Sequence, residues 1–448
     1  MQDTDTIFAL ATPSGKSGVA IIRISGGKAI HVFNFFQMSK GKERELNKTK
    51  VYFPGTEKVI DHALVVFFNS PKSFTGEDIV ELHTHGSAGV VKQVTELLIT
   101  IPSFRVAEPG EFTKRSFLHN KLDLTQVEGL VDLIDAETEA QVYQANKQIE
   151  GNLRKKYLEW KKALIEILAS VEALIDFPDE DINFNFNKKV YNAVDIITNE
   201  MSDSIDDKTG ELIKNGVFVS IIGPPNAGKS SLINYISKKE TSIVSEVPGT
   251  TRDVIETHIN LDGYPVTIAD TAGLTVTDDK IEKEGIRRAI KKSEQSDIVL
   301  AIFDGEFFPN LHKQTVERLT AKSILVINKS DLIHPSILNS SIDHIKSKDI
   351  NFISVKENLG IDVLTKKLTH QIKNILSLQT SIAPLTRQRH RQILNECVNS
   401  LNNIKRTTEA ELIAEDLRLT LRSLGRLVGK VDIEDVLDEL FKEFCIGK

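Results

Sequence analysis

One segment restricts the fold of this chain more than any other. Residues 223–231 read GPPNAGKSS and lie between the apolar run VFVSII and the helix-like run SLINYISK. Gly223 and Gly228 allow the backbone to turn so that its N–H groups face phosphate oxygens, and Lys229 reaches the outer phosphates. The hydroxyl of Ser230 is suited to binding Mg²⁺. This pattern between a strand and a helix predicts a nucleotide-binding α/β domain, and a plain glycine turn is a much weaker interpretation.

Three further motifs predict that the nucleotide carries guanine. NKSD ends in Asp331, whose carboxylate can accept two hydrogen bonds from the guanine edge, a pair of donors that adenine lacks. DTAG offers Asp270 to Mg²⁺ through water, and GTTRD offers Thr251 as a second Mg²⁺ hydroxyl. These motifs predict a GTPase. The expected GTP-binding residues are Asn226, Ala227, Gly228, Lys229, Ser230, Ser231, Ser245, Glu246, Val247, Pro248, Gly249, Thr250, Thr251, Asp270, Thr271, Ala272, Gly273, Asn328, Lys329, Asp331 and Ser354.

Two positions near these motifs are unusual. Leu274 follows DTAG, where Ras-type GTPases carry a glutamine that orients the attacking water. Another polar group must therefore position the water, and the acidic residues of segment 278–284 include a candidate, although most fit a solvated helix start equally well. The side-chain carbonyl of Asn226 can ligate a monovalent cation beside the phosphates. A turn-forming asparagine is the alternative.

The rest of the chain surrounds this α/β region. Residues 1–120 alternate short apolar runs with glycine and predict a mixed α+β domain. Residues 121–215 have few helix breakers and an apolar repeat of three and four residues, which predicts several packed helices, and residues 379–448 continue this pattern. Region 216–378, with five strand-like apolar runs, is an inserted doubly wound Ras-like domain. The fold class predicted is multidomain α/β, with a discontinuous helical domain.

Composition limits the possible classes of protein. Lys and Arg number 56 against 63 Asp and Glu, and the net charge of −7 argues against nucleic-acid binding through bulk charge, although a local basic patch is compatible with it. The two cysteines, Cys397 and Cys445, cannot form a disulfide framework and fit a reducing cytosol. The start of the chain does not resemble a signal peptide, and no apolar run reaches the about 20 residues of a membrane span. We expect a cytoplasmic protein without a membrane partner.

The chain resembles the bacterial GTPases that modify the wobble uridine of tRNA, the MnmE/TrmE type. The segments that carry the resemblance are DTIFALATPSGKSGVAIIRISG, SFTGEDIVELHTHGS, AEPGEFTKRSFLHNKLDLTQVEGLVDLIDAET, IDFPDED, the GTPase motifs and the terminal CIGK. The resemblance implies an N-terminal domain that binds folate and forms a homodimer. It also implies that Glu282 activates or orients water. The implied ion ligands are Ser230 and Thr251 for Mg²⁺, and Asn226, Ser245, Val247 and Thr250 for K⁺.

The resemblance also implies a folate site, formed by Arg23, Glu81, Lys121 and Lys448. The folate would be 5,10-methylene-tetrahydrofolate or 5-formyl-tetrahydrofolate. A tetrahydrofolate needs a carboxylate for its pterin N–H donors and cations for its acidic tail. Near the same tail, Cys445 is either a catalytic thiol or a packing residue. Prenylation of Cys445 is the weakest interpretation, because Ile-Gly-Lys is a poor prenylation signal.

The function implied is a K⁺-stimulated GTPase that works with an FAD- and NADH-dependent partner in a heterotetramer. Together they would add an aminomethyl or carboxymethylaminomethyl group to C5 of the wobble uridine of certain tRNAs. The alternative is a GTP-dependent switch in ribosome assembly or partner recruitment, without a modification reaction. Two local features depart from the family pattern. His83 and His85 share a strand face without an evident third metal ligand. HNK at 119–121 replaces the usual Asn-Gly-Lys of the family, so the turn before Lys121 can differ.

Overall fold

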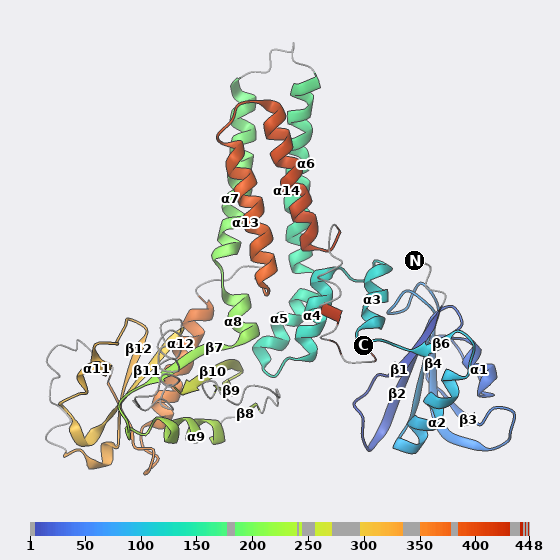
Figure 1. Cartoon of the computed structure of the whole chain (residues 1–448), viewed down its shortest axis with the longest axis horizontal. Coiled ribbons are helices and arrows are strands. Elements are labelled where there is room, and N and C mark those ends of the chain that lie inside the picture. The colour runs from blue at the N-terminus through green and yellow to red at the C-terminus, as the bar shows by residue number, and fades with distance from the viewer. Residues whose placement is uncertain are drawn as a thin grey trace, which may run out of the picture. The chain divides into compact units, whose positions relative to one another are not determined.

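The computed structural model describes residues 5–176, 184–239, 242–243, 256–270, 296–334, 350–377, 384–430, 440–441, 444 and 447 (Figure 1). The chain divides into two compact units. The first unit comprises Met1–Val131, Gln148–Ile182 and Asn403–Lys448, and the second comprises Asp132–Lys147 and Asn183–Asn402. The multidomain α/β fold class predicted from the sequence is confirmed, whereas the predicted domain boundaries stay a prediction.

The first unit contains a six-stranded sheet in the order β3-β4-β5-β2-β1-β6. Neighbouring strands are antiparallel except for the parallel pair β1 and β6. The register places Arg23 of β2 opposite Glu81 of β5. The strands are β1 (Thr6–Leu10), β2 (Ser17–Ser25), β3 (Asn47–Tyr52), β4 (Val59–Phe68), β5 (Ile79–Gly86) and β6 (Phe104–Val106).

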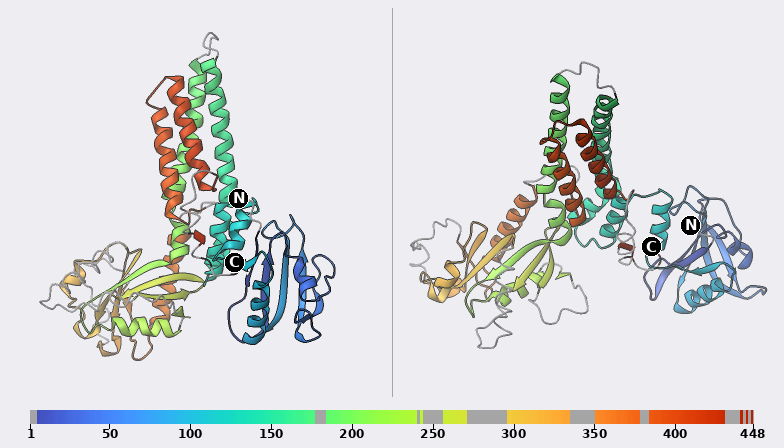
Figure 2. Two further views of the ribbon diagram at one scale, coloured as in Figure 1. Left: turned by 45° about the vertical axis from the view of Figure 1, so that its right-hand side comes forward. Right: turned by 45° about the horizontal axis from the view of Figure 1, so that its top comes forward.

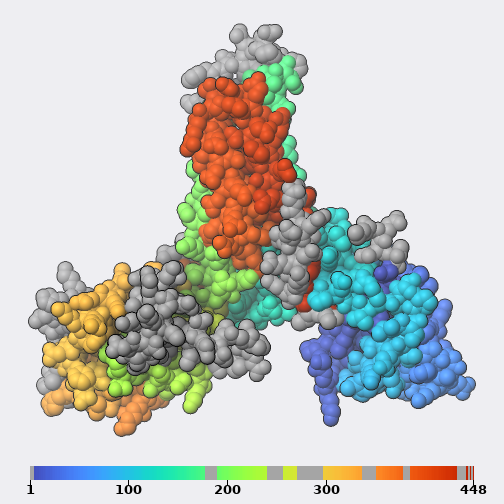
Figure 3. All heavy atoms as spheres, in the orientation of Figure 1, coloured from blue at the N-terminus to red at the C-terminus, as the bar shows by residue number. Residues whose placement is uncertain are grey.

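Apolar clusters lie on both faces of this sheet, because successive side chains of a strand point to opposite faces. On one face, Val32 and Val94 of two helices pack against sheet residues such as Ile22. On the other face, Phe112 packs against Ile7 of β1. Figure 2 shows the domain from two further directions, and in Figure 3 its atoms form a closely packed body. The helices are α1 (His31–Phe35), α2 (Ala88–Ile99) and α3 (Glu111–Leu118).

The segment after Leu122 that lacks helix breakers forms three helices, in agreement with the expectation of more than one helix there. Two turns interrupt it, one with Gly151 at φ 80°. Within the first unit, α6 and α14 lie side by side, and Arg418 Nη2 lies 2.7 Å from Glu172 Oε1. Leu124 and Val127 pack with Phe441 and Phe444 near the end of the chain. The helices are α4 (Leu124–Ile134), α6 (Asn152–Asp176) and α14 (Ala410–Leu427), together with α5 (Glu139–Ile149), most of which belongs to the second unit.

The second unit contains a seven-stranded sheet in the order β13-β12-β11-β7-β10-β9-β8. The strands β13, β12, β11, β7 and β10 are parallel, and β9 and β8 add an antiparallel edge. All five strands predicted in this region are present. The strands are β7 (Val217–Ile222), β8 (Ser242–Ile243), β9 (Glu256–Leu261), β10 (Tyr264–Asp270), β11 (Ile298–Asp304), β12 (Ser323–Asn328) and β13 (Asn351–Phe352).

Helices cover both faces of this sheet, which makes it doubly wound. Leu232 of α9 and Leu368 of α12 pack on one face, against Val219 and Leu300. Val316 of α11 packs against the cluster on the other face. The helices are α7 (Phe184–Asp206), α8 (Thr209–Asn215), α9 (Lys229–Lys239), α11 (Lys313–Val316), α12 (Ile361–Ser377) and α13 (Gln388–Ile404).

None of the helices in the described ranges combines the length and the apolar character needed to cross a membrane. The longest of them, α6, has 25 residues and includes Arg154, Lys155 and Lys156 near its start. Charged side chains of this kind are costly inside a bilayer.

Candidate functional site

The loop after β7 lies at the carboxyl edge of the parallel sheet. β7 sits between β11 and β10, and the chain builds β10 on one side of β7 before it crosses to form β11 on the other side. Such a reversal of strand order opens a crevice at the carboxyl ends of the strands, where α/β proteins bind their ligands. Helix α9 starts at Lys229, immediately after the loop. The predicted strand–loop–helix arrangement is therefore present.

The two glycines of this loop are required by close backbone contacts. A Cβ atom on Gly223 would lie 2.1 Å from the carbonyl oxygen of Ile302. A Cβ atom on Gly228, where φ is 93°, would lie 2.1 Å from the side-chain nitrogen of Asn328. Asn226 also has a positive φ of 63°, which asparagine tolerates better than most residues. The loop thus has the tight backbone that turns N–H groups toward an anion.

Lys229 is buried and lies under the same loop. Its Nζ donates hydrogen bonds to the carbonyl oxygens of Gly223 at 2.9 Å and Pro224 at 2.7 Å. These bonds hold the ammonium group at the mouth of the loop, next to the exposed residues Asn226 and Ser230. A cation and a helix N-terminus at one point favour phosphate binding.

Asn328 at the end of β12 joins two parts of the site. Its side chain is buried, donates to the carbonyl oxygen of Ala227 at 2.8 Å and accepts from the N–H of Val355 at 3.2 Å. Lys329 follows with φ 58°, and its Nζ lies 2.5 Å from Asp304 Oδ2. The amide of Asn328 therefore ties the phosphate loop to the segment around Val355.

Asp331 presents an exposed carboxylate beside these residues. A hydrogen bond with the Ser354 hydroxyl is the main reason that the pKa of Asp331 lies below its usual range, and Lys356 and Lys329 lower it further. The Ser354 hydroxyl also accepts the N–H of Glu357 at 3.1 Å, which fixes its orientation. Asp331 is thus charged at neutral pH and can accept the two donors of a guanine edge.

Strand β10 leads Asp270 to the same edge of the sheet, since Asp270 is the register partner of Ile221 in β7. The remaining predicted nucleotide and ion residues lie outside the described residues. They are Ser245, Glu246, Val247, Pro248, Gly249, Thr250, Thr251, Thr271, Ala272, Gly273 and Glu282. The structure therefore brings together the phosphate-loop and base-recognition residues that it describes.

A second polar site lies on the sheet of the first unit. Arg23 Nε donates to Glu81 Oε1 at 2.9 Å, and the Arg23 guanidinium lies 5.7 Å from the ring centres of both Phe74 and Phe112. Among the described residues, no hydrogen-bond partner is found for the terminal amino groups of Arg23. The two residues predicted to contact folate therefore form one pair, flanked by two aromatic rings.

The Glu81 carboxylate in this pair stays ionised. Burial alone would raise its pKa, but the hydrogen bond with His83 and the charge and hydrogen bond of Arg23 outweigh burial. The net result is a pKa of Glu81 below its ordinary value. A carboxylate that is both partly buried and ionised can accept hydrogen bonds from a ligand with N–H donors.

Of the other predicted folate residues, Lys121 is among the described residues and Lys448 is not. Lys121 is exposed after α3, and its N–H donates to the carbonyl oxygen of Ser116 at 2.9 Å. Asn120 before it has φ 56°, so the asparagine adopts the backbone conformation that a glycine would take. A Cβ on Gly447 would lie 2.2 Å from the carbonyl oxygen of Leu10. Lys448 and Cys445 themselves lie outside the described residues.

The histidines of β5 have protein partners. His83 Nε2 lies 3.4 Å from Glu81 Oε2, and His85 Nδ1 lies 2.7 Å from Asp61 Oδ1. Within the part of the chain that the structure describes, no group of three or more metal-ligating side chains occurs. Each of the two histidines therefore has a carboxylate as its hydrogen-bond partner.

Sequence reasoning missed the aromatic part of this second site. Phe74 and Phe112 are 38 positions apart in the sequence, and no local spacing links them to Arg23. The structure indicates a binding role for Phe74, because 37% of its surface is accessible to solvent. This exposure could not be seen in the sequence. Asp304, which holds Lys329, was also missed, although it directly follows an apolar strand-like run.

Comparison with known proteins agrees with this geometry. Residues 6–121 match the family model described as the GTP-binding protein TrmE N-terminus, and residues 124–445 match the MnmE helical domain model. Two similar proteins, each named tRNA modification GTPase MnmE, come from Rickettsia canadensis (strain McKiel) and Ehrlichia ruminantium (strain Gardel). They are 41% identical over 448 residues and 43% identical over 447 residues, and each alignment covers 99% of this chain and 100% of the relative.

A solved G domain of the T. maritima FeoB iron transporter aligns with 35% of this chain and 98% of its own length, at 22% identity and a TM-score of 0.26. That TM-score is too low to support an inference about this chain. The doubly wound sheet, the phosphate loop and the guanine-recognition residues define a P-loop GTPase. The full-length similarity is more specific, and the chain belongs to the MnmE family of GTPases.

Proposed function

We propose that this protein is a K⁺-stimulated GTPase that takes part in modification of the tRNA wobble uridine. With an FAD- and NADH-dependent partner, it adds an aminomethyl or carboxymethylaminomethyl group to C5 of that uridine, using a one-carbon unit carried by tetrahydrofolate. The relatives named tRNA modification GTPase MnmE support the tRNA substrate. We expect the reaction in the cytoplasm, by a homodimer that joins its partner in a heterotetramer.

The observation that carries this proposal is the presence of two binding sites in one chain. One site joins a phosphate loop with an ionised Asp331, which fits a guanine nucleotide. The other site joins the Arg23–Glu81 pair with two aromatic rings, which fits a ring with N–H donors and an acidic tail. A GTPase that acts only as a conformational switch has no need of the second site.

The phosphate loop also fits the proposed ions. The exposed hydroxyl of Ser230 at the start of α9 is a hard oxygen ligand of the kind that Mg²⁺ prefers, and Thr251 would add a second. The exposed Asn226 can offer its carbonyl to K⁺, together with oxygens of Ser245, Val247 and Thr250. A cation beside the phosphates would stabilise charge that develops during hydrolysis.

The end of the chain supports the proposed folate site. Gly447 packs against Leu10, and the neighbouring Ala9 is the register partner of Arg23. Lys448 follows Gly447 in the sequence, and we propose that its cation binds the acidic tail of the folate. Under this proposal Cys445 acts either as a thiol in the modification reaction or as a packing residue.

Hydrolysis in different salts tests the role of K⁺. The purified protein should hydrolyse GTP faster in KCl than in NaCl of equal ionic strength, because K⁺ has the larger radius that the Asn226 site is proposed to select. Phosphate release is the measurement. Equal rates in the two salts would remove K⁺ from the mechanism.

Glu282 is the residue that we propose to activate or orient the attacking water. Glu282→Ala should bind GTP as tightly as the natural chain and hydrolyse it about 100-fold more slowly, in line with the usual contribution of a general base. Nucleotide titration and single-turnover hydrolysis separate the two effects. Unchanged turnover would exclude Glu282 from this role.

Analysis of tRNA distinguishes modification from a switch in ribosome assembly. Nucleosides of tRNA from cells that lack the gene should show an unmodified wobble uridine by mass spectrometry, and the modification should return with the gene. If tRNA nucleosides are unchanged while ribosomal subunits accumulate as precursors, the ribosome-assembly switch is the better description.

A further inference from the structure

Helix α3 and the loop before β5 together form a rigid aromatic support at the second site. The loop residues Phe74–Glu77 lie between β4 and β5, and Phe74 keeps 37% of its surface exposed. Phe112 of α3, by contrast, is fully buried. Both ring centres lie 5.7 Å from the Arg23 guanidinium, so this cation is close to one exposed and one buried ring.

Two side chains, one within α3 and one directly after its last residue, hold the backbone of this loop. Ser116 Oγ donates to the carbonyl oxygen of Phe74 at 2.8 Å. His119 Nδ1 lies 2.7 Å from the carbonyl oxygen of Thr75, which can only accept, so this nitrogen donates. The His119 ring also packs closely on Gly76, where a Cβ would lie 3.0 Å from His119 Cβ. The position of the Phe74 ring is therefore set from α3.

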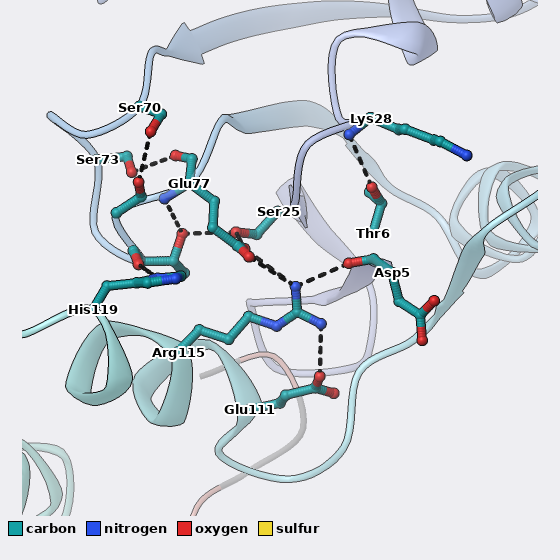
Figure 4. Close-up of polar contacts among 12 residues, drawn as sticks. Asp5, Thr6, Ser25, Lys28, Ser70, Ser73, Glu77, Glu111, Arg115 and His119 are labelled. Atoms are coloured by element: carbon teal, nitrogen blue, oxygen red, sulfur yellow. Dashed lines mark hydrogen bonds and ion pairs between the residues drawn. The ribbon is translucent and has the colours of Figure 1, made fainter. Parts of the chain in front are cut away.

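A buried ionic network fixes the other end of the loop (Figure 4). Arg115 Nη1 donates to both Glu77 oxygens, at 3.1 and 3.2 Å, and Arg115 Nη2 donates to Glu111 Oε1 at 2.9 Å. Ser25 Oγ donates to Glu77 Oε2 at 2.7 Å. Arg115 is 1% exposed, so this network is shielded from water. A loop with so many fixed contacts does not need an exposed phenylalanine for its own stability.

We propose that Phe74 is a binding residue of the second site, and that Ser116 and His119 are the positioning residues for it. This inference rests on the proposed function, because the ligand class is a reduced pterin that carries an acidic tail. The exposed face of the Phe74 ring packs on a planar part of that ligand, while Phe74 and Phe112 hold Arg23 with its terminal amino groups toward the acidic tail.

Binding of 5-formyl-tetrahydrofolate to the full-length protein tests this inference. Phe74→Ala should weaken binding about tenfold in calorimetric titration, whereas Phe74→Tyr, which keeps the ring, should bind nearly as well as the natural chain. Ser116→Ala should give an intermediate loss. Ser70→Ala is the matched control, because Ser70 Oγ also donates to a loop carbonyl, that of Gly76 at 2.8 Å, but does not hold Phe74. Thermal unfolding and GTP hydrolysis of each variant check that the fold is intact.

The fluorescence of a tryptophan variant adds a measurement that would not change on ligand binding if Phe74 had only a structural role. The natural chain has one tryptophan, Trp160, which is buried in α6. In a Trp160→Phe background, Phe74→Trp should lose fluorescence when the folate binds, because the bound ring lies against the indole.

The outcomes distinguish a failure of the proposed folate binding from a failure of the inference about Phe74. If the natural chain does not bind the folate, the folate part of the proposed function fails. If the natural chain binds and Phe74→Ala binds equally well, the inference about Phe74 is wrong while the proposed function stands. If Phe74→Ala is weak but Ser116→Ala equals the Ser70→Ala control, the positioning role of Ser116 is wrong.

Discussion

Recognition of the base in the nucleotide site depends on a few side chains whose hydrogen bonds leave little freedom. Ser354 holds the exposed Asp331 carboxylate through its hydroxyl, and that hydroxyl is itself oriented by the N–H of Glu357. Asn328, a neighbour in the same motif, has its side-chain amide engaged with Ala227 and Val355. Of the two, Asn328 is buried and Asp331 is exposed, so Asp331 is the residue that can select the base.

Asp331→Asn should therefore change the preferred nucleotide. The amide replaces one acceptor with a donor, so it faces the guanine N–H groups with a mismatched partner, and GTP affinity should fall about 100-fold or more. Xanthine carries a carbonyl where guanine carries its amino group, and the variant should bind XTP better than the natural chain does. Titration with fluorescent analogues of GTP and XTP measures the affinity of the variant and of the natural chain for each nucleotide. A variant that loses GTP without gaining XTP would indicate collapse of the loop instead of altered selection.

At the scale of elements, α3 joins the sheet of the first unit through Glu111. Arg105 donates to both Glu111 oxygens, at 2.8 and 2.6 Å, and the N–H of Glu108 and Arg115 Nη2 add further bonds. Burial alone would raise the pKa of Glu111, but these hydrogen bonds and the charge of Arg115 outweigh it, so the pKa lies below its ordinary value. The ionised form of Glu111 therefore stabilises the folded state.

Glu111→Gln should destabilise the first unit by about 2 kcal/mol at pH 7, since it removes one of the two carboxylates that pair with the buried Arg115 guanidinium. A carboxyl with a lowered folded pKa contributes stability above its unfolded pKa of about 4.3, and that stability is lost as the pH falls through the folded pKa. The difference between natural chain and variant should thus shrink below about pH 4. Urea unfolding at several pH values measures it. Glu108→Gln, at an exposed side chain beside the same helix start, is the control, and an equal loss there would contradict a specific role for Glu111.

The sequence predicts regular elements well where a single segment contains the whole pattern. The apolar run VFVSII and the glycines after it predict β7 and its loop, since both depend on adjacent residues. β9 was missed, although the turn at Asp262 and Gly263, with φ 51° and 86°, is an Asp-Gly signal for the β9–β10 hairpin. Its apolar alternation is weak because polar residues such as His258 occupy partly exposed positions of the strand.

The residues of the candidate sites were likewise predicted where a single short segment contains the pattern. Lys229 and Asp331 follow from motifs of a few residues, and the structure brings their segments to one edge of the sheet. The Arg23–Glu81 pair followed only from the family resemblance, because a cross-strand register of 58 positions leaves no trace in local sequence. Neither the local motifs nor the family resemblance predicted a role for Phe74, because that role depends on contacts with α3 that exist only after folding.

At the scale of the whole molecule, the two sites belong to different compact units. The nucleotide residues from Gly223 to Ser354 lie in the second unit, and Arg23, Phe74 and Glu81 lie in the first. A ligand stabilises the cooperative unit that binds it, by about 2.7 kcal/mol at a hundredfold excess over its dissociation constant. Each ligand should therefore act on its own unit first.

Calorimetry tests this separation. In the full-length protein, GDP with Mg²⁺ at a hundredfold excess over its dissociation constant should raise the midpoint of one thermal transition by about 5–10 °C, since each kcal/mol shifts a unit of roughly 150–250 residues by about 2–4 °C. The other transition should stay in place and move instead when 5-formyl-tetrahydrofolate is added. Asp331→Asn should abolish only the shift caused by GDP, because its substitution lies in the second unit and leaves Arg23 and Glu81 untouched. One single transition that moves with either ligand would mean that the two units unfold together, and the sites would then be coupled through the stability of the whole chain.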